Sequence, residues 1–148
     1  MRIVTESPEE TERLGQKIGR YLKEQEQTRI VCLYGDLGAG KTTLIKGIAS
    51  ALGVPGRDVG SASFVIVAEY ETTPPFHHID LYRVEREEDL DALGIWEYLD
   101  GSGIAVIEWA ERLPDLPDGA LKVTLSYLDE DRRGIEIESV DEKHWRHL

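Results

Sequence analysis

The amino-acid sequence predicts an α/β fold, in which helices flank a mixed, mostly parallel sheet that carries an antiparallel β-hairpin near its C-terminal end. Three observations indicate this fold class. A glycine-rich loop, residues 35–40, connects a short apolar run to a helical pattern. Apolar runs alternate with helical patterns as far as residue 108, and two runs of alternating apolar and polar residues follow. The 148 residues contain no internal repeat or linker, so we expect one domain spanning residues 1–148.

The first predicted helix begins at Ser7 and ends near Glu26. Serine is a favoured N-cap residue, and Pro8 suits the first helical position. Glu10, three residues after Ser7, completes the pattern of a capping box. Apolar side chains then recur at helical spacing, at Leu14, Ile18, Tyr21 and Leu22.

A strand and a second helix are expected on either side of the glycine-rich loop. Residues 29–34 form a short apolar run that ends at a glycine, which predicts a buried strand. Cys32, the only cysteine, lies in this run and is expected to be a buried, unreactive thiol. Residues 41–52 contain no proline and carry apolar side chains on one side, which predicts a helix that stops at Gly53.

The middle of the chain predicts two strands and two short helices. Residues 64–70 and 76–79 have strand patterns around a proline-rich turn, residues 73–75. Residues 85–93 are acidic and predict a solvated helix, and residues 94–99 are compatible with a second short one.

The last third of the chain is expected to complete the sheet. Residues 103–107 form another buried apolar run. Residues 121–128 and 135–140 both alternate apolar and polar side chains, and the turn at 129–134 joins them into an antiparallel hairpin. Residues 141–148 are compatible with a short terminal helix.

Composition restricts the classes of partner. The formal net charge is −12, and we find no cluster of lysine and arginine of the kind that binds nucleic-acid phosphates. We therefore expect no strong direct nucleic-acid binding, whereas an acidic face suits a basic protein partner. No apolar run reaches the roughly 20 residues needed to cross a bilayer, and the first residues lack the apolar stretch of a signal peptide. These features predict a cytoplasmic protein that does not bind membranes.

The glycine-rich loop has the Walker A pattern, Gly35-x4-Gly40-Lys41-Thr42, in the expected place between a strand and a helix. Glycines allow backbone N–H groups to surround an anion, and the following helix adds the positive end of its dipole. Lys41 supplies a positive charge to the β- and γ-phosphates, and the hydroxyl of Thr42 suits Mg²⁺. The loop therefore predicts a P-loop NTPase-like domain that binds ATP/ADP with Mg²⁺.

Two acidic residues follow predicted strands. Asp80 comes directly after residues 76–79, and Glu108 comes directly after residues 103–107. A phosphate-loop enzyme needs an acid near the metal at the C-terminal end of a buried strand. Either carboxylate is suited to hold Mg²⁺ through water or to orient the attacking water, and the sequence does not decide between these roles.

Three segments form a combination that is highly specific in its order and spacing. They are Leu33-Tyr34-Gly35-Asp36-Leu37-Gly38-Ala39-Gly40-Lys41-Thr42-Thr43-Leu44, His78-Ile79-Asp80-Leu81-Tyr82-Arg83 and Ile107-Glu108-Trp109. Together they resemble the motifs of the TsaE (YjeE) family, the ATPase component of bacterial tRNA threonylcarbamoyladenosine (t6A) biosynthesis. The resemblance covers roughly residues 11–137. It departs from the family at Ser61-Ala62-Ser63, where the family has Ser-Pro-Thr in a switch-like loop, and the lost proline should leave this loop less rigid.

The resemblance implies a Mg²⁺-dependent ATPase that is weak alone and acts on a complex of TsaB and TsaD type proteins. ATP hydrolysis would drive the turnover of that complex, which modifies adenosine at position 37 of tRNA. The implied catalytic residues are Lys41, Asp80 and Glu108, and the implied metal ligands are Thr42, Glu108 and Asp80. The implied nucleotide contacts are Thr11, Gly35, Leu37, Gly38, Ala39, Gly40, Lys41, Thr42, Thr43, Ser63, Trp109 and Arg133.

Several alternatives remain open from the residues alone. Thr11 and Arg133 are equally compatible with a helix-surface hydroxyl and a solvated turn arginine. A small-molecule kinase would also use the loop, although no arginine-rich lid or acceptor pocket is evident, and a GTP-driven switch lacks its Asn-Lys-x-Asp signature. His77 and His78 are adjacent on a predicted strand and so point to opposite faces, which disfavours a shared zinc ion. His78 is instead expected to brace the region of Asp80.

Overall fold

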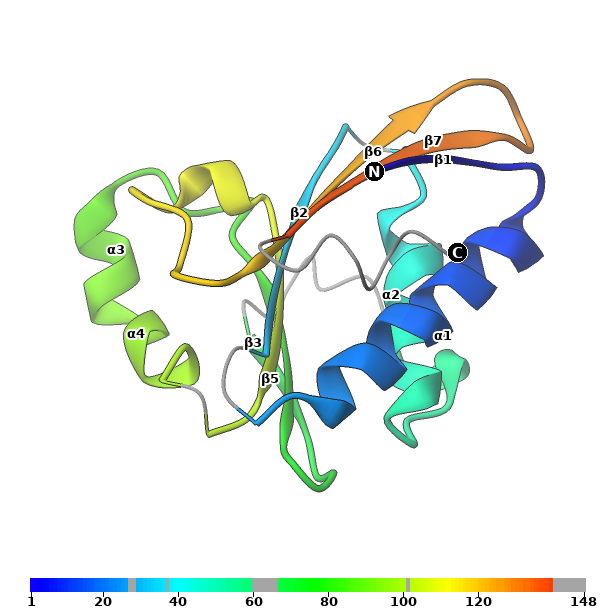
Figure 1. The fold of residues 1–148 in the computed structure, drawn as a ribbon. Coiled ribbons are helices and arrows are strands. Elements are labelled where there is room, and N and C mark those ends of the chain that lie inside the picture. The colour runs from blue at the N-terminus through cyan, green and yellow to red at the C-terminus, as the bar shows by residue number, and fades with distance from the viewer. Residues whose placement is uncertain (27–28, 37, 60–66, 101, 140–148) are drawn as a thin grey trace.

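The computed structural model describes residues 1–26, 29–36, 38–59, 67–100 and 102–139. In these residues a seven-stranded sheet separates two layers of helices (Figure 1). Helices α1 (Pro8–Glu24) and α2 (Lys41–Ala51) cover one face, and the shorter α3 (Glu87–Ala92) and α4 (Ile95–Tyr98) cover the other. No helix in the described part of the chain is long and apolar enough to cross a membrane. The predicted α/β architecture, with helices on both faces, is confirmed.

The sheet is mixed. Its strands are β1 (Arg2–Thr5), β2 (Ile30–Tyr34), β3 (Val67–Tyr70), β4 (Phe76–Asp80), β5 (Ile104–Glu108), β6 (Leu121–Tyr127) and β7 (Arg133–Glu138), in the spatial order β1-β7-β6-β2-β5-β4-β3. The central pairs β6–β2, β2–β5 and β5–β4 are parallel, whereas β1–β7, β7–β6 and β4–β3 are antiparallel. The hairpin of β6 and β7 is confirmed. The mixed, mostly parallel sheet is also confirmed: β1, β6, β2, β5 and β4 run in one direction, and β7 and β3 run in the other.

Strand β1 is the element that the sequence pattern fails to predict. It pairs with β7, so that Ile3 lies opposite Ile135. Four residues are too few to show a periodicity, and the partner strand lies at the other end of the chain. Two short 3₁₀ helices, η1 (Gly56–Asp58) and η2 (Ala110–Arg112), were likewise not expected.

The predicted start of α1 is confirmed, with one change in the capping box. Ser7 has an extended backbone, and its Oγ accepts the N–H of Glu10 at 3.2 Å. The Glu10 carboxylate accepts the N–H of Glu6 at 2.6 Å, one residue before the expected donor. The helix ends at Glu24 rather than near Glu26. The prediction of a helix over 141–148 lies outside the described residues.

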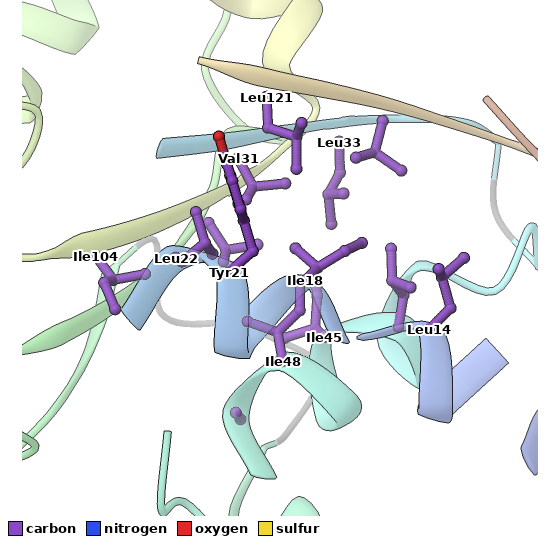
Figure 2. Close-up of a cluster of buried hydrophobic side chains, with 14 of the residues drawn as sticks. Leu14, Ile18, Tyr21, Leu22, Val31, Leu33, Ile45, Ile48, Ile104 and Leu121 are labelled. Atoms are coloured by element: carbon purple, nitrogen blue, oxygen red, sulfur yellow. The ribbon is translucent and has the colours of Figure 1, made fainter. Parts of the chain in front are cut away.

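Helices α1 and α2 lie so close that their backbones are in contact. A Cβ added to Gly47 would lie 2.0 Å from the carbonyl oxygen of Glu12, and one added to Gly15 would lie 2.2 Å from that of Leu44. Apolar side chains of both helices, among them Ile18, Leu22, Ile45 and Ile48, pack against the sheet residues Val31, Leu33 and Leu121 (Figure 2). Since α2 begins with Lys41, this packing also holds the end of the phosphate loop.

The opposite face of the sheet buries a second apolar cluster, which contains Cys32, Ile79 and Ile107. Burial raises the pKa of the Cys32 thiol from its ordinary value of 9.0 to about 12. The side chain is therefore protonated at neutral pH and shielded from solvent, as predicted from its place in a buried strand.

We expect Cys32 to resist thiol reagents in the folded protein, because only an exposed thiolate reacts quickly. At pH 8 a chromogenic disulfide reagent should label none of the native chains and one thiol per chain in concentrated urea. Labelling of the native protein at a rate similar to that of the unfolded chain would contradict this expectation.

Candidate active site

The phosphate loop leaves β2 at Tyr34 and enters α2 at Lys41. Gly35 has φ +141, and a Cβ there would lie 2.6 Å from the carbonyl oxygen of Leu125 on β6. Gly40 has φ +98 and forms the N-cap of α2 without a side-chain hydrogen bond. Both positions therefore favour glycine, and the cap leaves the first N–H groups of α2 for an external anion. Asp36, Gly38 and Ala39 complete the described part of the loop, and Leu37 lies outside it.

Lys41 carries a buried cation at the base of this loop. The residue is 6% exposed, and its Nζ has no hydrogen-bond partner among the residues that the structure describes. The nearest compensation is the face of the Trp109 ring, whose centroid lies 4.2 Å from Nζ. A buried ammonium without an acceptor is costly, so the site fits an anionic ligand such as a phosphate. Next to it on α2, Thr42 is exposed and Thr43 is half-buried.

Asp80 and Glu108 face each other at the ends of two parallel strands. They are register partners in the β4–β5 pair, so their side chains project from the same face of the sheet. That face is the one covered by α2, because Val106, two residues before Glu108, lies in the same core cluster as Leu44 of α2. The structure thus brings the two predicted acids together.

The two carboxyl groups differ in their surroundings. Glu108 is 7% exposed, and Asp80 is half-buried with its Oδ1 accepting the N–H of Tyr82 at 2.9 Å. Burial raises the pKa of Asp80 above its ordinary value, and the nearby Glu108 carboxylate raises it further. The Tyr82 N–H and the positive charge of Lys41 oppose that rise. The Lys41 ammonium therefore lies near enough to Asp80 for its charge to act on that carboxyl group.

The adjacent histidines face opposite sides of the sheet, as predicted. His78 Nε2 lies 2.7 Å from Oε2 of Glu108, and both side chains are buried. His77 lies on the other side, where its Nε2 is 3.3 Å from Oε1 of Glu69 and its ring packs against Tyr98 of α4. The direct hydrogen-bond partner of His78 is therefore Glu108, whereas the sequence suggested the region of Asp80.

Trp109 follows Glu108, and its ring covers the Lys41 ammonium. Its backbone is left-handed, with φ +57 and ψ +44, a conformation that few non-glycine residues adopt. The ring packs against Tyr82, with centroids 5.0 Å apart, and lies over the Lys41 ammonium. The turn therefore directs the indole across the loop, where the resemblance predicts a nucleotide contact.

Arg133 lies against the loop, whereas Thr11 is used within the scaffold. The Arg133 side chain passes Gly40, where an added Cβ would lie 3.4 Å from its Cγ, and its guanidinium lies over the Tyr127 ring. Its Nε is buried and has no acceptor in the described residues. The Thr11 hydroxyl lies 2.7 Å from that of Thr5 and joins α1 to β1. Of these two predicted nucleotide contacts, the structure brings only Arg133 next to the loop.

Comparison with known proteins shows the family of the chain. The family model described as "Threonylcarbamoyl adenosine biosynthesis protein TsaE" matches residues 5–135 of the chain. The chain belongs to the TsaE family. A TsaE from Treponema pallidum is 36% identical, and the alignment covers 93% of this chain and 99% of the relative. A TsaE from Aquifex aeolicus is 40% identical, with 91% and 93% covered. The crystal structure of YdiB from Bacillus subtilis is 31% identical, with a TM-score of 0.75 over 99% of this chain and 95% of that one.

Two residues expected to contact nucleotide in TsaE proteins cannot be placed. Leu37 and Ser63, together with the altered Ser61-Ala62-Ser63 segment, lie outside the described residues. Their predicted roles stay predictions.

A cavity of about 480 Å³ opens beside the phosphate loop of this TsaE family member. Its lining includes Asp36 and Ala39 of the loop, Trp109 and Glu111, and residues 124–127 at the end of β6. Sequence reasoning missed the contribution of β6, since no local motif marks it. The register of β2 and β6, with Tyr34 opposite Thr124, brings that strand end beside the loop.

We expect ATP to change the tryptophan fluorescence of this TsaE protein, because an anion on Lys41 would alter the contact between its ammonium and the Trp109 ring. Trp109→Phe should remove most of this change. Trp96 on α4, which is 42% exposed on the far side of the sheet, offers a matched control, and Trp96→Phe should preserve the response. A response that survives in Trp109→Phe and disappears in Trp96→Phe would show that the contact with Lys41 is not the reporter.

Proposed function

We propose that this protein binds and hydrolyses ATP with Mg²⁺ and thereby drives the turnover of a complex of TsaB and TsaD type proteins in t6A modification of tRNA position 37. The observation that carries the proposal is the buried Lys41 ammonium, which has no hydrogen-bond acceptor in the described residues and lies over the Trp109 ring at the base of the loop. Membership of the TsaE family supports the pathway.

The roles of the residues follow from their chemistry. Lys41 and the free N–H groups at the start of α2 would bind the phosphate oxygens of ATP. Thr42, Asp80 and Glu108 provide the oxygen ligands that suit Mg²⁺, which when bound neutralises charge on the phosphates. The carboxylate that does not hold the metal would orient the water that attacks the γ-phosphorus. The products are ADP and inorganic phosphate, and ATP is the only phosphoryl donor required.

The charge of the chain favours proteins over tRNA as its direct contacts. A net charge of −12 repels a polyanion, so an acidic surface would dock on a basic protein surface. Trp109 is half-buried beside Tyr82, which is 53% exposed. A partner that contacts this aromatic pair would reach the nucleotide site directly.

A small-molecule kinase is a second candidate, favoured by the cavity beside the loop. The cavity has room for a small acceptor, and its lining includes the polar residues Asp36, Glu111 and Ser126. Transfer to an acceptor would need the same loop and metal, so only the fate of the γ-phosphate separates the two functions.

Phosphate release measured with and without partners tests the proposal. The purified chain should release phosphate from ATP slowly, EDTA should stop the release, and added TsaB and TsaD type proteins should accelerate it. GTP in excess should compete poorly with ATP. Rapid turnover by the chain alone would count against dependence on partners, and preferential use of GTP would overturn the ATP assignment. Substantial phosphorylation of a small acceptor would favour the kinase.

A further inference from the structure

His78 and Glu108 form a buried pair next to the proposed metal site. His78 is 1% exposed, and its Nε2 lies 2.7 Å from Oε2 of Glu108. In the register of β4 and β5, His78 lies opposite Val106 and Asp80 lies opposite Glu108, so the histidine and the glutamate are diagonal neighbours on one face. The pairing therefore follows from the sheet itself rather than from a surface loop.

The surroundings of the two ring nitrogens of His78 differ. Carboxylate oxygens accept hydrogen bonds, so we assign the donor of the contact with Glu108 to Nε2–H of His78. The other ring nitrogen, Nδ1, is buried and has no hydrogen-bond partner in the described residues. The ring can thus donate one hydrogen bond in one direction, to one oxygen of Glu108.

The same short motif anchors both acids. Asp80 has its Oδ1 held by the N–H of Tyr82 at 2.9 Å, and Glu108 has its Oε2 held by His78 at 2.7 Å. Each carboxylate therefore has one oxygen committed to the protein, which leaves its other oxygen to be presented to a ligand. Partners of this kind fix the orientation of metal-binding carboxylates and influence metal affinity strongly.

We propose that His78 is a positioning residue that orients Glu108 for Mg²⁺ through the Nε2–H hydrogen bond. This inference rests on the proposed function. It means that His78, on β4, positions Glu108, which lies at the end of the neighbouring strand β5. His78 does not touch the nucleotide in this scheme. Substitution of His78 should therefore reduce only the gain in ATP affinity that Mg²⁺ provides.

The test compares ATP affinity in saturating Mg²⁺ with ATP affinity in EDTA, together with the thermal midpoint of each protein without nucleotide. For His78→Leu we expect the Mg²⁺-dependent gain in affinity to fall by about 10-fold or more, in the range seen when partners of metal ligands are removed. The affinity in EDTA should stay within about twofold of wild type. His78→Gln should recover most of the gain, because its amide nitrogen reaches the position of Nε2 and can donate there.

His77 supplies the matched control. It is the neighbouring histidine on the same strand, is also buried, and contacts Glu69 instead of Glu108. His77→Leu should leave the Mg²⁺-dependent gain unchanged even if it lowers the thermal midpoint. If His78→Leu does not fold, His78→Gln is compared with His78→Asn, whose shorter amide ends near the position of Nδ1 and should fail to restore the gain.

The outcomes separate this inference from the function on which it rests. A wild-type protein that binds ATP equally well with Mg²⁺ and with EDTA would overturn the proposed metal site and the role of His78 together. A wild-type Mg²⁺ effect that is retained in folded His78→Leu, or restored equally by Asn and Gln, would overturn the role of His78 alone. If His78→Leu lowered the ATP affinity by the same factor in EDTA and in Mg²⁺, His78 would have a general structural role. This result would also overturn its role as a positioning residue.

Discussion

Lys41→Ala is expected to weaken ATP binding by at least about 100-fold, which corresponds to about 2.7 kcal/mol. Loss of one partner from a buried charged pair has effects of this size. The same change should not destabilise the nucleotide-free protein, because the ammonium that it removes is buried without a hydrogen-bond acceptor in the described residues. The thermal midpoint without nucleotide should stay the same or rise, while the rise caused by ATP disappears.

Calorimetric titration with ATP and thermal melts with and without ATP check this prediction. Lys46→Ala is the matched control, since Lys46 lies on the same helix and is half-buried. It should retain nearly the full affinity. Wild-type ATP binding by a folded Lys41→Ala variant would show that the nucleotide does not occupy this loop.

Gly47→Ala is expected to lower the free energy of unfolding by about 3 kcal/mol or more, a large share of the stability of an ordinary domain. The added methyl group would lie 2.0 Å from the carbonyl oxygen of Glu12, and a backbone atom inside a helix cannot move aside alone. Helices α1 and α2 would have to separate. The better helix propensity of alanine, about 1 kcal/mol, is too small to offset this loss.

Urea and thermal melts of the nucleotide-free protein measure the effect, which should lower the thermal midpoint by roughly 6–12 °C. Gly56→Ala is the control, because the nearest atom to its added Cβ is Cβ of Lys46 at 3.5 Å, an ordinary contact. It should change the midpoint little. A Gly47→Ala protein as stable as Gly56→Ala would mean that the two helices are not in backbone contact.

Features that depend on a few neighbouring residues could be predicted from the sequence. The Ser7 cap, the strand before the loop and the two acids at strand ends have local signals, and the structure shows the first two where expected and brings the acids together. The short strand β1 has no such signal, because its partner β7 lies at the other end of the chain.

The contacts inside the site depend on strand order and register, which local patterns do not contain. His78 reaches Glu108 because β4 lies beside β5, and Leu125 meets Gly35 because β6 lies beside β2. The position of Trp109 over Lys41 further requires a left-handed backbone at Trp109, which a tryptophan in the sequence does not predict. The residues of the candidate site were therefore predictable, but most of their partners were not.

The place of β1 has a consequence for how the chain is made. In the described sheet β1 is an edge strand paired with β7, with Arg2 opposite Glu136 and Thr5 opposite Arg133. The neighbours of β2, namely β5 and β6, also come later in the chain. During synthesis the first strand emerges from the ribosome long before its partner, and contacts between such distant residues form slowly. Closure of the sheet must therefore wait until almost the whole chain is available, and ribosome-bound chains that lack β7 would present unpaired strand edges to chaperones or to one another.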